Sequence, residues 1–145
     1  MTIFLFVKTA CVEGRGTLGG TCLNVGCIPS KALLHNSHLY HEAKHEFEAR
    51  GIKLPGGVEL DLPTMHKSKE RAMTGLTGGV AMLLKMNKVT WAKGWGKITG
   101  PNSISVSKED GTTEELSTKN IVVATGSEST PLPGVEVKAD LFLLY

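Results

Sequence analysis

The sequence predicts an α/β fold, in which a parallel sheet is combined with helices and an antiparallel β insertion. Three observations predict it. Apolar runs near the N-terminus and near residue 121 are typical of strands buried in a parallel sheet. Two long segments between these runs have helical periodicity. A series of short strand-like runs then follows the second helical segment.

The first half of the chain is expected to form a strand and a helix. Residues 2–13 are a mostly apolar stretch ending in Glu13, which predicts a strand buried on both faces. A glycine-rich loop over residues 14–20 follows. A helix is then predicted over residues 28–47, because apolar and histidine side chains fall on opposite arcs. The apolar arc comprises Ala32, Leu33, Leu39, Tyr40, Ala43 and Phe47, and the opposite arc comprises His35, His38, His41 and His45.

A second helix is predicted over residues 62–86, after a loop at residues 50–61. Asp61 is its expected N-cap. Three glycines inside this helix each cost about 1 kcal/mol relative to alanine, so we expect close packing or a kink there. These glycines are Gly75, Gly78 and Gly79.

The last third of the chain has the pattern of an antiparallel meander followed by one buried strand. The meander runs are residues 89–92, 95–98, 102–107 and 113–117, with a turn at Asp110-Gly111. Residues 121–124 are expected to form a further buried strand that opens into Thr125-Gly126-Ser127. This order of elements is typical of an α/β nucleotide-binding domain with a β insertion.

Composition favours one globular domain and excludes several kinds of partner. The chain has 145 residues, of which 41% are hydrophobic, enough for a substantial core. The net charge of +2 and the scattered basic residues argue against nucleic-acid binding. The longest apolar run, residues 3–7, is far shorter than the roughly 18 residues of a membrane span. The odd count of three cysteines favours a reducing compartment, with Cys11 as a small buried hydrophobe.

The most informative segment places Cys22 and Cys27 five positions apart at the start of a helical pattern. On a regular helix, five residues turn through about 500° and rise about 7.5 Å, which is too far for a disulfide. The backbone between the thiols must therefore be irregular, and Gly26 and Pro29 suit such an irregularity. A bridge across so short a loop adds little stability. The spacing therefore predicts an exchangeable, redox-active disulfide.

The run Cys-Leu-Asn-Val-Gly-Cys-Ile-Pro-Ser-Lys-Ala-Leu-Leu, residues 22–34, resembles the active-site helix of the flavin-dependent disulfide oxidoreductases. It is most similar to their dihydrolipoamide dehydrogenase branch. The resemblance implies that residues 1–137 are a partial FAD-binding, Rossmann-like domain with a β-meander insertion, and that residues 138–145 are a tail unrelated to the family. It also implies a parent enzyme that oxidises dihydrolipoamide to lipoamide with FAD and NAD+.

The resemblance further implies roles for individual residues. Cys22 would be the interchange thiol that reacts with the substrate, and Cys27 would face the flavin. A helix N-terminus with Lys31 nearby would supply the low-pKa thiolate that this chemistry needs, and Lys31 would lie near the reactive edge of the flavin. Glu13 would hold ribose hydroxyls of the adenosine part of FAD. The remaining flavin contacts implied are Gly96, Thr125, Gly126 and Ser127.

Residues 14–19 satisfy G-x-G-x-x-G, but we expect this match to be a decoy. A dinucleotide fingerprint needs a strand ending in an acidic residue about 20 positions later, and residues 33–39 are predicted to be helical. If Glu13 is that acidic residue, the phosphate-binding loop and the first βαβ unit would precede Met1. We therefore expect the chain alone to be inactive and to bind FAD poorly.

The same resemblance implies the partners and location of the parent enzyme. Its substrate would be the lipoamide of 2-oxoacid dehydrogenase or glycine cleavage complexes, and it would be a homodimer of the mitochondrial matrix. No transit peptide is visible in this chain, and neither nucleic acid nor membrane is an expected partner.

Two alternatives come from other classes of protein. The pattern C-x4-C-x13-H-x3-H approximates the spacing of a Cys2His2 zinc finger. Its four residues are Cys22, Cys27, His41 and His45. A solvated helix face explains the histidines more simply, so no metal ligand is predicted. The second alternative is a non-catalytic thiol/disulfide protein.

Overall fold

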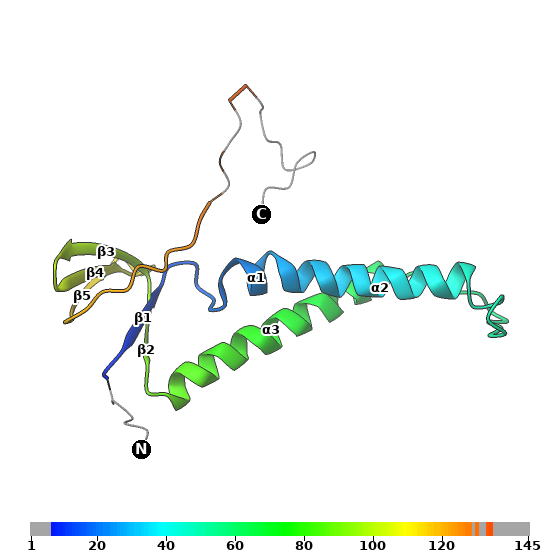
Figure 1. The fold of residues 1–145 in the computed structure, drawn as a ribbon, viewed down its shortest axis with the longest axis horizontal. Coiled ribbons are helices and arrows are strands. Elements are labelled where there is room, and N and C mark those ends of the chain that lie inside the picture. Colours follow the sequence, from blue (N-terminus) through cyan, green and yellow to red (C-terminus); the bar gives the residue numbers. More distant parts are fainter. Residues whose placement is uncertain (1–6, 129, 131–132, 135–145) are drawn as a thin grey trace, which may run out of the picture. The chain divides into compact units, whose positions relative to one another are not determined.

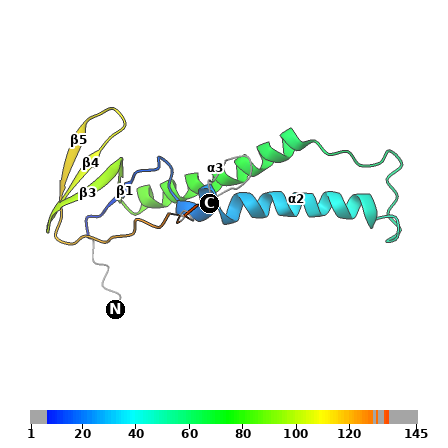
Figure 2. The same ribbon diagram turned by 90° about the horizontal axis from the view of Figure 1, so that it is seen from above.

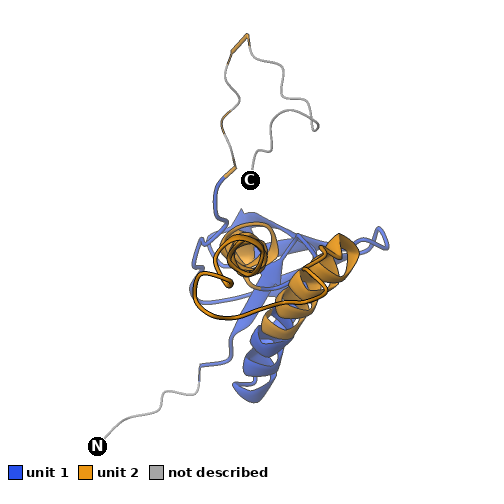
Figure 3. Cartoon of the chain, turned by 90° about the vertical axis from the view of Figure 1, so that its right-hand side faces the viewer, with its two compact units in different colours: residues 1–18, 77–127 blue, residues 19–76, 128–145 orange. Residues whose placement is uncertain are grey.

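The computed structural model divides into two compact units (Figure 3). It describes residues 7–128, 130 and 133–134. Unit 1 consists of residues 1–18 and 77–127, and unit 2 of residues 19–76 and 128–145. The expected tail, residues 138–145, and the first part of the expected N-terminal strand lie outside the described residues.

A parallel strand pair begins unit 1 (Figure 1). β1 (Ala10–Glu13) pairs with β2 (Thr90–Lys93) in parallel. Parallel strands need a long crossover connection, and the helical segments between β1 and β2 supply it. The prediction of parallel pairing for the first strand is confirmed. The assignment of residues 89–92 to the antiparallel meander was wrong, because apolar alternation does not encode strand direction.

β1 is shorter and more exposed than predicted. It begins at Ala10 rather than at residue 2, since residues 7–9 are not in a strand. A strand extends only as far as a partner satisfies its backbone groups, and β2 has four residues. Ala10 is exposed and the other residues of β1 are half-buried. The expected burial on both faces is therefore not observed in the described structure.

The predicted antiparallel meander is confirmed for the next three strands (Figure 2). β3 (Trp95–Gly100) pairs with β4 (Ser103–Ser107), which pairs with β5 (Thr113–Ser117). The turn at Asp110-Gly111 also forms as predicted. Gly111 adopts a φ of 81°, and the Thr112 amide donates to Asp110 Oδ1 at 2.9 Å.

Residues 121–124 do not form the strand that the sequence predicts. Val122 and Val123 are 87% and 68% exposed. A parallel-sheet strand needs neighbours that pair with its backbone, and none of the described strands pairs with this segment. An apolar, β-branched composition alone was therefore insufficient to predict a strand at residues 121–124.

Two helices with a break between them begin unit 2 (Figure 1). α1 (Gly20–Asn24) was not predicted, and α2 (Cys27–His45) was predicted with its start one residue and its end two residues too late. The histidine arc of α2 is exposed, as expected, and most of its apolar arc is half-buried. Leu39 is the exception in that arc, with 46% of its surface exposed.

α3 (Leu62–Met86) has the predicted bounds and the predicted cap. Asp61 Oδ1 accepts the Thr64 amide at 3.0 Å, and its Oδ2 accepts the Thr64 hydroxyl at 2.6 Å. These hydrogen bonds lower the pKa of Asp61. The close packing expected at the three glycines is wrong. A Cβ at Gly75, Gly78 or Gly79 would meet no described atom within 4 Å.

The core of the described chain is small and lies in unit 1. Its buried apolar residues are Leu18, Ala92 and Val106. The substantial core expected from composition is therefore not observed, because many apolar side chains remain exposed. They include Trp95, Ile98, Met82, Met86, Val122 and Val123. No helix among the described residues is long and apolar enough to cross a membrane.

We expect Val106→Ala to destabilise unit 1 by about 2 kcal/mol, because the side chain is fully buried in β4. Val122→Ala makes the same chemical change at a site that is 87% exposed, and should change stability by less than about 0.5 kcal/mol. Urea unfolding followed by far-UV circular dichroism measures both. Equal destabilisation by the two variants would contradict the placement of the core.

Candidate redox site

The two cysteines predicted to react lie on either side of a helix break. Cys22 lies in α1, and Cys27 is the first residue of α2. The Val25 amide donates to the Thr21 carbonyl at 3.0 Å at the end of α1. The Ser30 amide donates to the Gly26 carbonyl at 3.2 Å at the start of α2. The backbone irregularity that the spacing required is therefore confirmed.

Gly26 permits the two sides of the break to approach each other. A Cβ at this position would lie 3.0 Å from the Thr21 carbonyl oxygen and 3.4 Å from Cys22 Cα. The first of these distances is tighter than side chains normally tolerate, so a larger residue would displace the turn that carries Cys22. Glycine at this position thus keeps the two cysteines close.

Cys22 and Cys27 are free thiols and both residues are exposed, and the Cys27 side chain is near enough to raise the pKa of Cys22. The Cys22 sulfur also interacts with the backbone amides of Cys27 and Ile28. These two amides belong to the first turn of α2, where N–H groups have no partner within the helix. The start of α2 thus supplies donors to the sulfur of Cys22.

The Cys27 side chain has the largest effect on the pKa of Cys22. A hydrogen bond with this side chain raises the pKa of Cys22, and desolvation and repulsion from Cys27 act in the same direction. The backbone amides of Cys27 and Ile28 oppose this shift but do not reverse it. The neighbouring thiol therefore outweighs the amides in setting the direction of this shift.

Lys31 and Pro29 lie in the first turns of α2. Pro29 is the third residue of the helix, where its missing N–H costs no helical hydrogen bond. Lys31 is exposed and lies four residues, about one turn, after Cys27.

Cys11 lies in the other unit and is half-buried, and this burial raises its pKa.

Glu13 and Gly96 belong to unit 1. Glu13 ends β1, and its Oε1 accepts the Arg15 amide at 2.8 Å. Gly96 lies in β3, where a Cβ would be 3.1 Å from Val12 Cγ1. The packing of β3 against β1 therefore explains this glycine without any ligand.

Thr125, Gly126 and Ser127 lie in an exposed segment without regular structure, also in unit 1. Gly126 has a φ of 77°, in the left-handed region that favours glycine. The sequence placed these residues at the end of a strand. The structure corrects this, since residues 121–124 are not a strand.

The length of α2 tests both the G-x-G-x-x-G match and the zinc-finger alternative. Residues 33–39 lie inside this helix, as predicted, where a dinucleotide fingerprint would need a strand. His41 follows Cys27 by 14 residues of continuous helix, a rise of about 21 Å. The four residues of the finger pattern therefore cannot hold one ion. No group of three or more metal-binding side chains occurs among the described residues.

Sequence analysis missed two features of this segment. It did not identify the amides of Cys27 and Ile28 as donors, although the expected break implied an exposed helix start. His41 and His45 were interpreted as part of a solvated helix face or of a zinc finger, whereas residues 41–45 also spell H-E-x-x-H on one helix.

The family of this chain follows from its similarity to known proteins. A family model described as pyridine nucleotide-disulphide oxidoreductase matches residues 6–143. The chain belongs to this family. The resemblance inferred from residues 22–34 is thereby confirmed, as is the assignment to an oxidoreductase family.

Curated relatives within the family are more specific. The chain is 56% identical over 133 residues to dihydrolipoyl dehydrogenase 1, mitochondrial, of Arabidopsis thaliana. It is 56% identical over 134 residues to the mitochondrial dihydrolipoyl dehydrogenase of Mus musculus, and 55% identical over 133 residues to leghemoglobin reductase of Vigna unguiculata. Each alignment covers 92% of this chain, but the chain spans only about a quarter of each relative's length.

A solved structure has the same fold. LpdA of Mycobacterium tuberculosis matches with a TM-score of 0.73 over 90% of this chain and 28% of that protein. The sequence identity is 21%, so this likeness concerns the fold alone. It confirms the prediction of a partial, Rossmann-like α/β domain.

We expect mild oxidation to join Cys22 to Cys27 and to leave Cys11 free, because the first two thiols are in contact and Cys11 is half-buried in another unit. Alkylation of free thiols followed by peptide mapping measures the pairing. A dominant bridge that includes Cys11 would show that the contact across the helix break is wrong.

Proposed function

We propose that this chain carries the redox-active cysteine pair of a flavin-dependent dihydrolipoyl dehydrogenase. The contact of the Cys22 and Cys27 thiols across the break between α1 and α2 carries the proposal. The names of relatives that are 56% identical support the choice of dihydrolipoamide as substrate. In this function, the pair cycles between a disulfide and a dithiol.

Cys22 is the thiol that exchanges with the substrate. A thiolate of dihydrolipoamide attacks the Cys22 sulfur of the disulfide, which forms a mixed disulfide and releases Cys27 as a thiolate. The second thiol of the substrate, once deprotonated, then attacks the other substrate sulfur, which is bonded to Cys22 in the mixed disulfide. This step closes lipoamide and releases the sulfur of Cys22. One substrate dithiol is oxidised and one protein disulfide is reduced.

The start of α2 assists the release of Cys22. Its sulfur carries negative charge as it leaves, and the amides of Cys27 and Ile28 are placed to stabilise that charge. The neighbouring Cys27 side chain raises the pKa of Cys22.

The proposal includes a set of flavin-binding residues. The family implies FAD, which when bound would take two electrons from the dithiol and pass them to NAD+. The Glu13 carboxylate uses Oε1 for the Arg15 amide and has further acceptor capacity for ribose hydroxyls. The remaining proposed contacts are Lys31, Gly96, Thr125, Gly126 and Ser127. In this proposal residues 1–137 form part of the FAD-binding domain.

The proposed setting follows the printed names of the relatives. Several of them are mitochondrial dihydrolipoyl dehydrogenases, which supports the mitochondrial matrix as the location. The proposed substrates are the lipoyl groups of 2-oxoacid dehydrogenase or glycine cleavage complexes, and the proposed parent enzyme is a homodimer.

A chimera tests whether these residues support the activity. Residues 8–128 of this chain replace the aligned segment of the mouse dihydrolipoyl dehydrogenase, which is 56% identical. We expect the chimera to bind FAD and to form NADH from dihydrolipoamide and NAD+. Cys22→Ser should abolish turnover, because it removes the exchanging sulfur, whereas Cys11→Ser should retain it.

A chimera that holds FAD but forms no NADH would contradict the proposal, as would turnover that survives Cys22→Ser. A second measurement applies if the chimera does not fold. Oxidised full-length chain is mixed with dihydrolipoamide, and the Cys22–Cys27 bridge is followed by quenched thiol labelling. Persistence of the bridge at equilibrium with excess dihydrolipoamide would also contradict the proposal.

A further inference from the structure

The exposed end of α2 carries a histidine pair that the redox function does not use. His41 and His45 are four residues apart, so they lie on one face of the helix. Their rings are in contact, with centroids 4.7 Å apart and planes tilted by 44°. Both residues are exposed, and neither ring has a hydrogen bond among the described residues. Two imidazoles are thus held side by side and open to solvent.

We propose that His41 and His45 form a two-ligand site for a first-row divalent cation such as Ni²⁺ or Zn²⁺. Imidazole is the commonest protein ligand of these metals, and two histidines at positions i and i+4 are the helical arrangement that chelates zinc. Metal–nitrogen bonds of about 2.0–2.1 Å require one nitrogen from each ring to reach a common ion. Rings already in contact need only side-chain rotation to do so. Water completes the coordination.

The charged groups around the pair balance one another and supply no third ligand. Glu42 lies in α2 and Glu46 is the residue after its end, and Arg50 pairs with both carboxylates. Lys44, between the two histidines in sequence, is bound to the Tyr40 hydroxyl at 3.3 Å and lies over its ring. The site therefore has two nitrogen ligands in a region whose carboxylates are already paired with Arg50.

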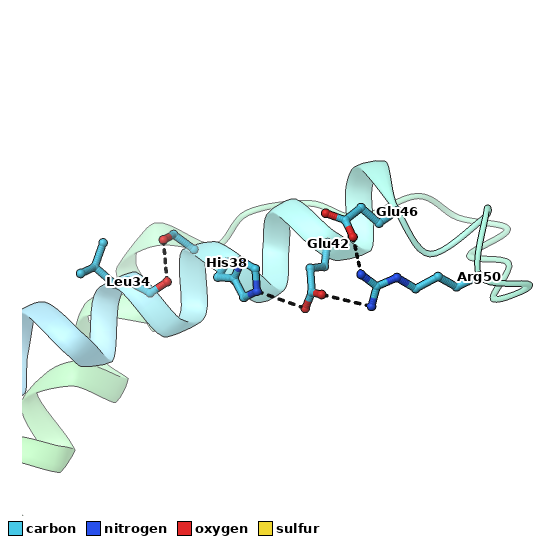
Figure 4. A network of polar contacts seen from close by, with 6 residues as sticks. Leu34, His38, Glu42, Glu46 and Arg50 are labelled. Carbon is cyan, nitrogen blue, oxygen red and sulfur yellow. Dashed lines mark hydrogen bonds and ion pairs between the residues drawn. The ribbon is translucent and has the colours of Figure 1, made fainter.

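The arrangement does not support the hydrolase that the letters H-E-x-x-H suggest. In such enzymes, the glutamate acts as a general base. Here, Glu42 is already engaged on both sides (Figure 4). Arg50 Nη1 lies 3.2 Å from Glu42 Oε1, and His38 Nε2 lies 3.6 Å from its Oε2. Arg50 also pairs with Glu46. Glu42 therefore anchors a surface ion-pair network, and the proposal is a metal-binding site only.

A bound cation should tie the penultimate and last turns of α2 together. His45 is the last residue of the helix, where hydrogen bonds fray most easily. A ligand that binds only the folded helix stabilises it by mass action. Metal binding should thus raise the thermal stability of the chain, and this effect should require both histidines.

The test uses the full chain with Cys22→Ser and Cys27→Ser, because thiolates also bind these metals. Ni²⁺ is titrated by calorimetry, and the unfolding temperature is measured with and without the ion. We expect one Ni²⁺ per chain and a rise in unfolding temperature. His45→Gln and, separately, His41→Gln should each weaken Ni²⁺ binding by at least about tenfold, since one ligand of two is lost.

The matched control is His66→Gln, which removes an exposed helical histidine that has no histidine three or four residues away. It should bind Ni²⁺ as tightly as the parent. Circular dichroism checks that each variant keeps its helix content. The proposal is overturned if His41→Gln and His45→Gln bind as tightly as His66→Gln, or if all three variants lose affinity equally.

Discussion

The contact between two sulfur atoms depends on a helix break that only a small residue permits. Without the break, Cys22 and Cys27 would leave a continuous helix from different faces, about 7.5 Å apart along its axis. With it, α1 ends at Asn24, α2 starts at Cys27, and the Cys27 side chain is near enough to raise the pKa of Cys22. Gly26 makes this possible because it approaches the Thr21 carbonyl without a side chain. The chemistry proposed for the chain follows from this local geometry.

The break also creates the electrostatic setting of the pair. A new helix start presents unpaired amides, and those of Cys27 and Ile28 reach the Cys22 sulfur. The neighbouring thiol nevertheless has the larger effect and raises the pKa of Cys22. The Cys22 sulfur therefore experiences two opposing influences, the amides at the start of α2 and the neighbouring thiol.

The sequence predicted the structure best where an element depends only on residues near it in the chain. The bounds and cap of α3 were predicted from apolar periodicity and from Asp61, and the irregular backbone between the cysteines followed from helix geometry. Prediction failed where the outcome depends on pairing between distant segments. Residues 121–124 have strand composition but no partner among the described strands, and β2 pairs with β1 rather than with the meander.

The candidate site shows the same division between local and non-local information. Spacing and flanking residues identified Cys22 and Cys27, because both reactive groups lie within one short segment. The direction of the pKa shift at Cys22 was not predictable, since it depends on how closely the second sulfur approaches. Gly96 was assigned to a ligand, yet its contact with Val12 gives a packing reason that appears only once β1 and β3 are placed.

The most direct test of the central claim is the stability of the Cys22–Cys27 disulfide in Gly26→Ala, measured as its equilibrium constant against glutathione. The added Cβ would lie 3.0 Å from the Thr21 carbonyl oxygen. We expect the disulfide form to retain about 1 kcal/mol of this strain, whereas the dithiol form can relax, so the equilibrium constant should fall about fivefold. Gly56→Ala, where a Cβ meets nothing within 4 Å, should leave it unchanged. An equilibrium constant in Gly26→Ala equal to that of the parent chain and of Gly56→Ala would contradict the account.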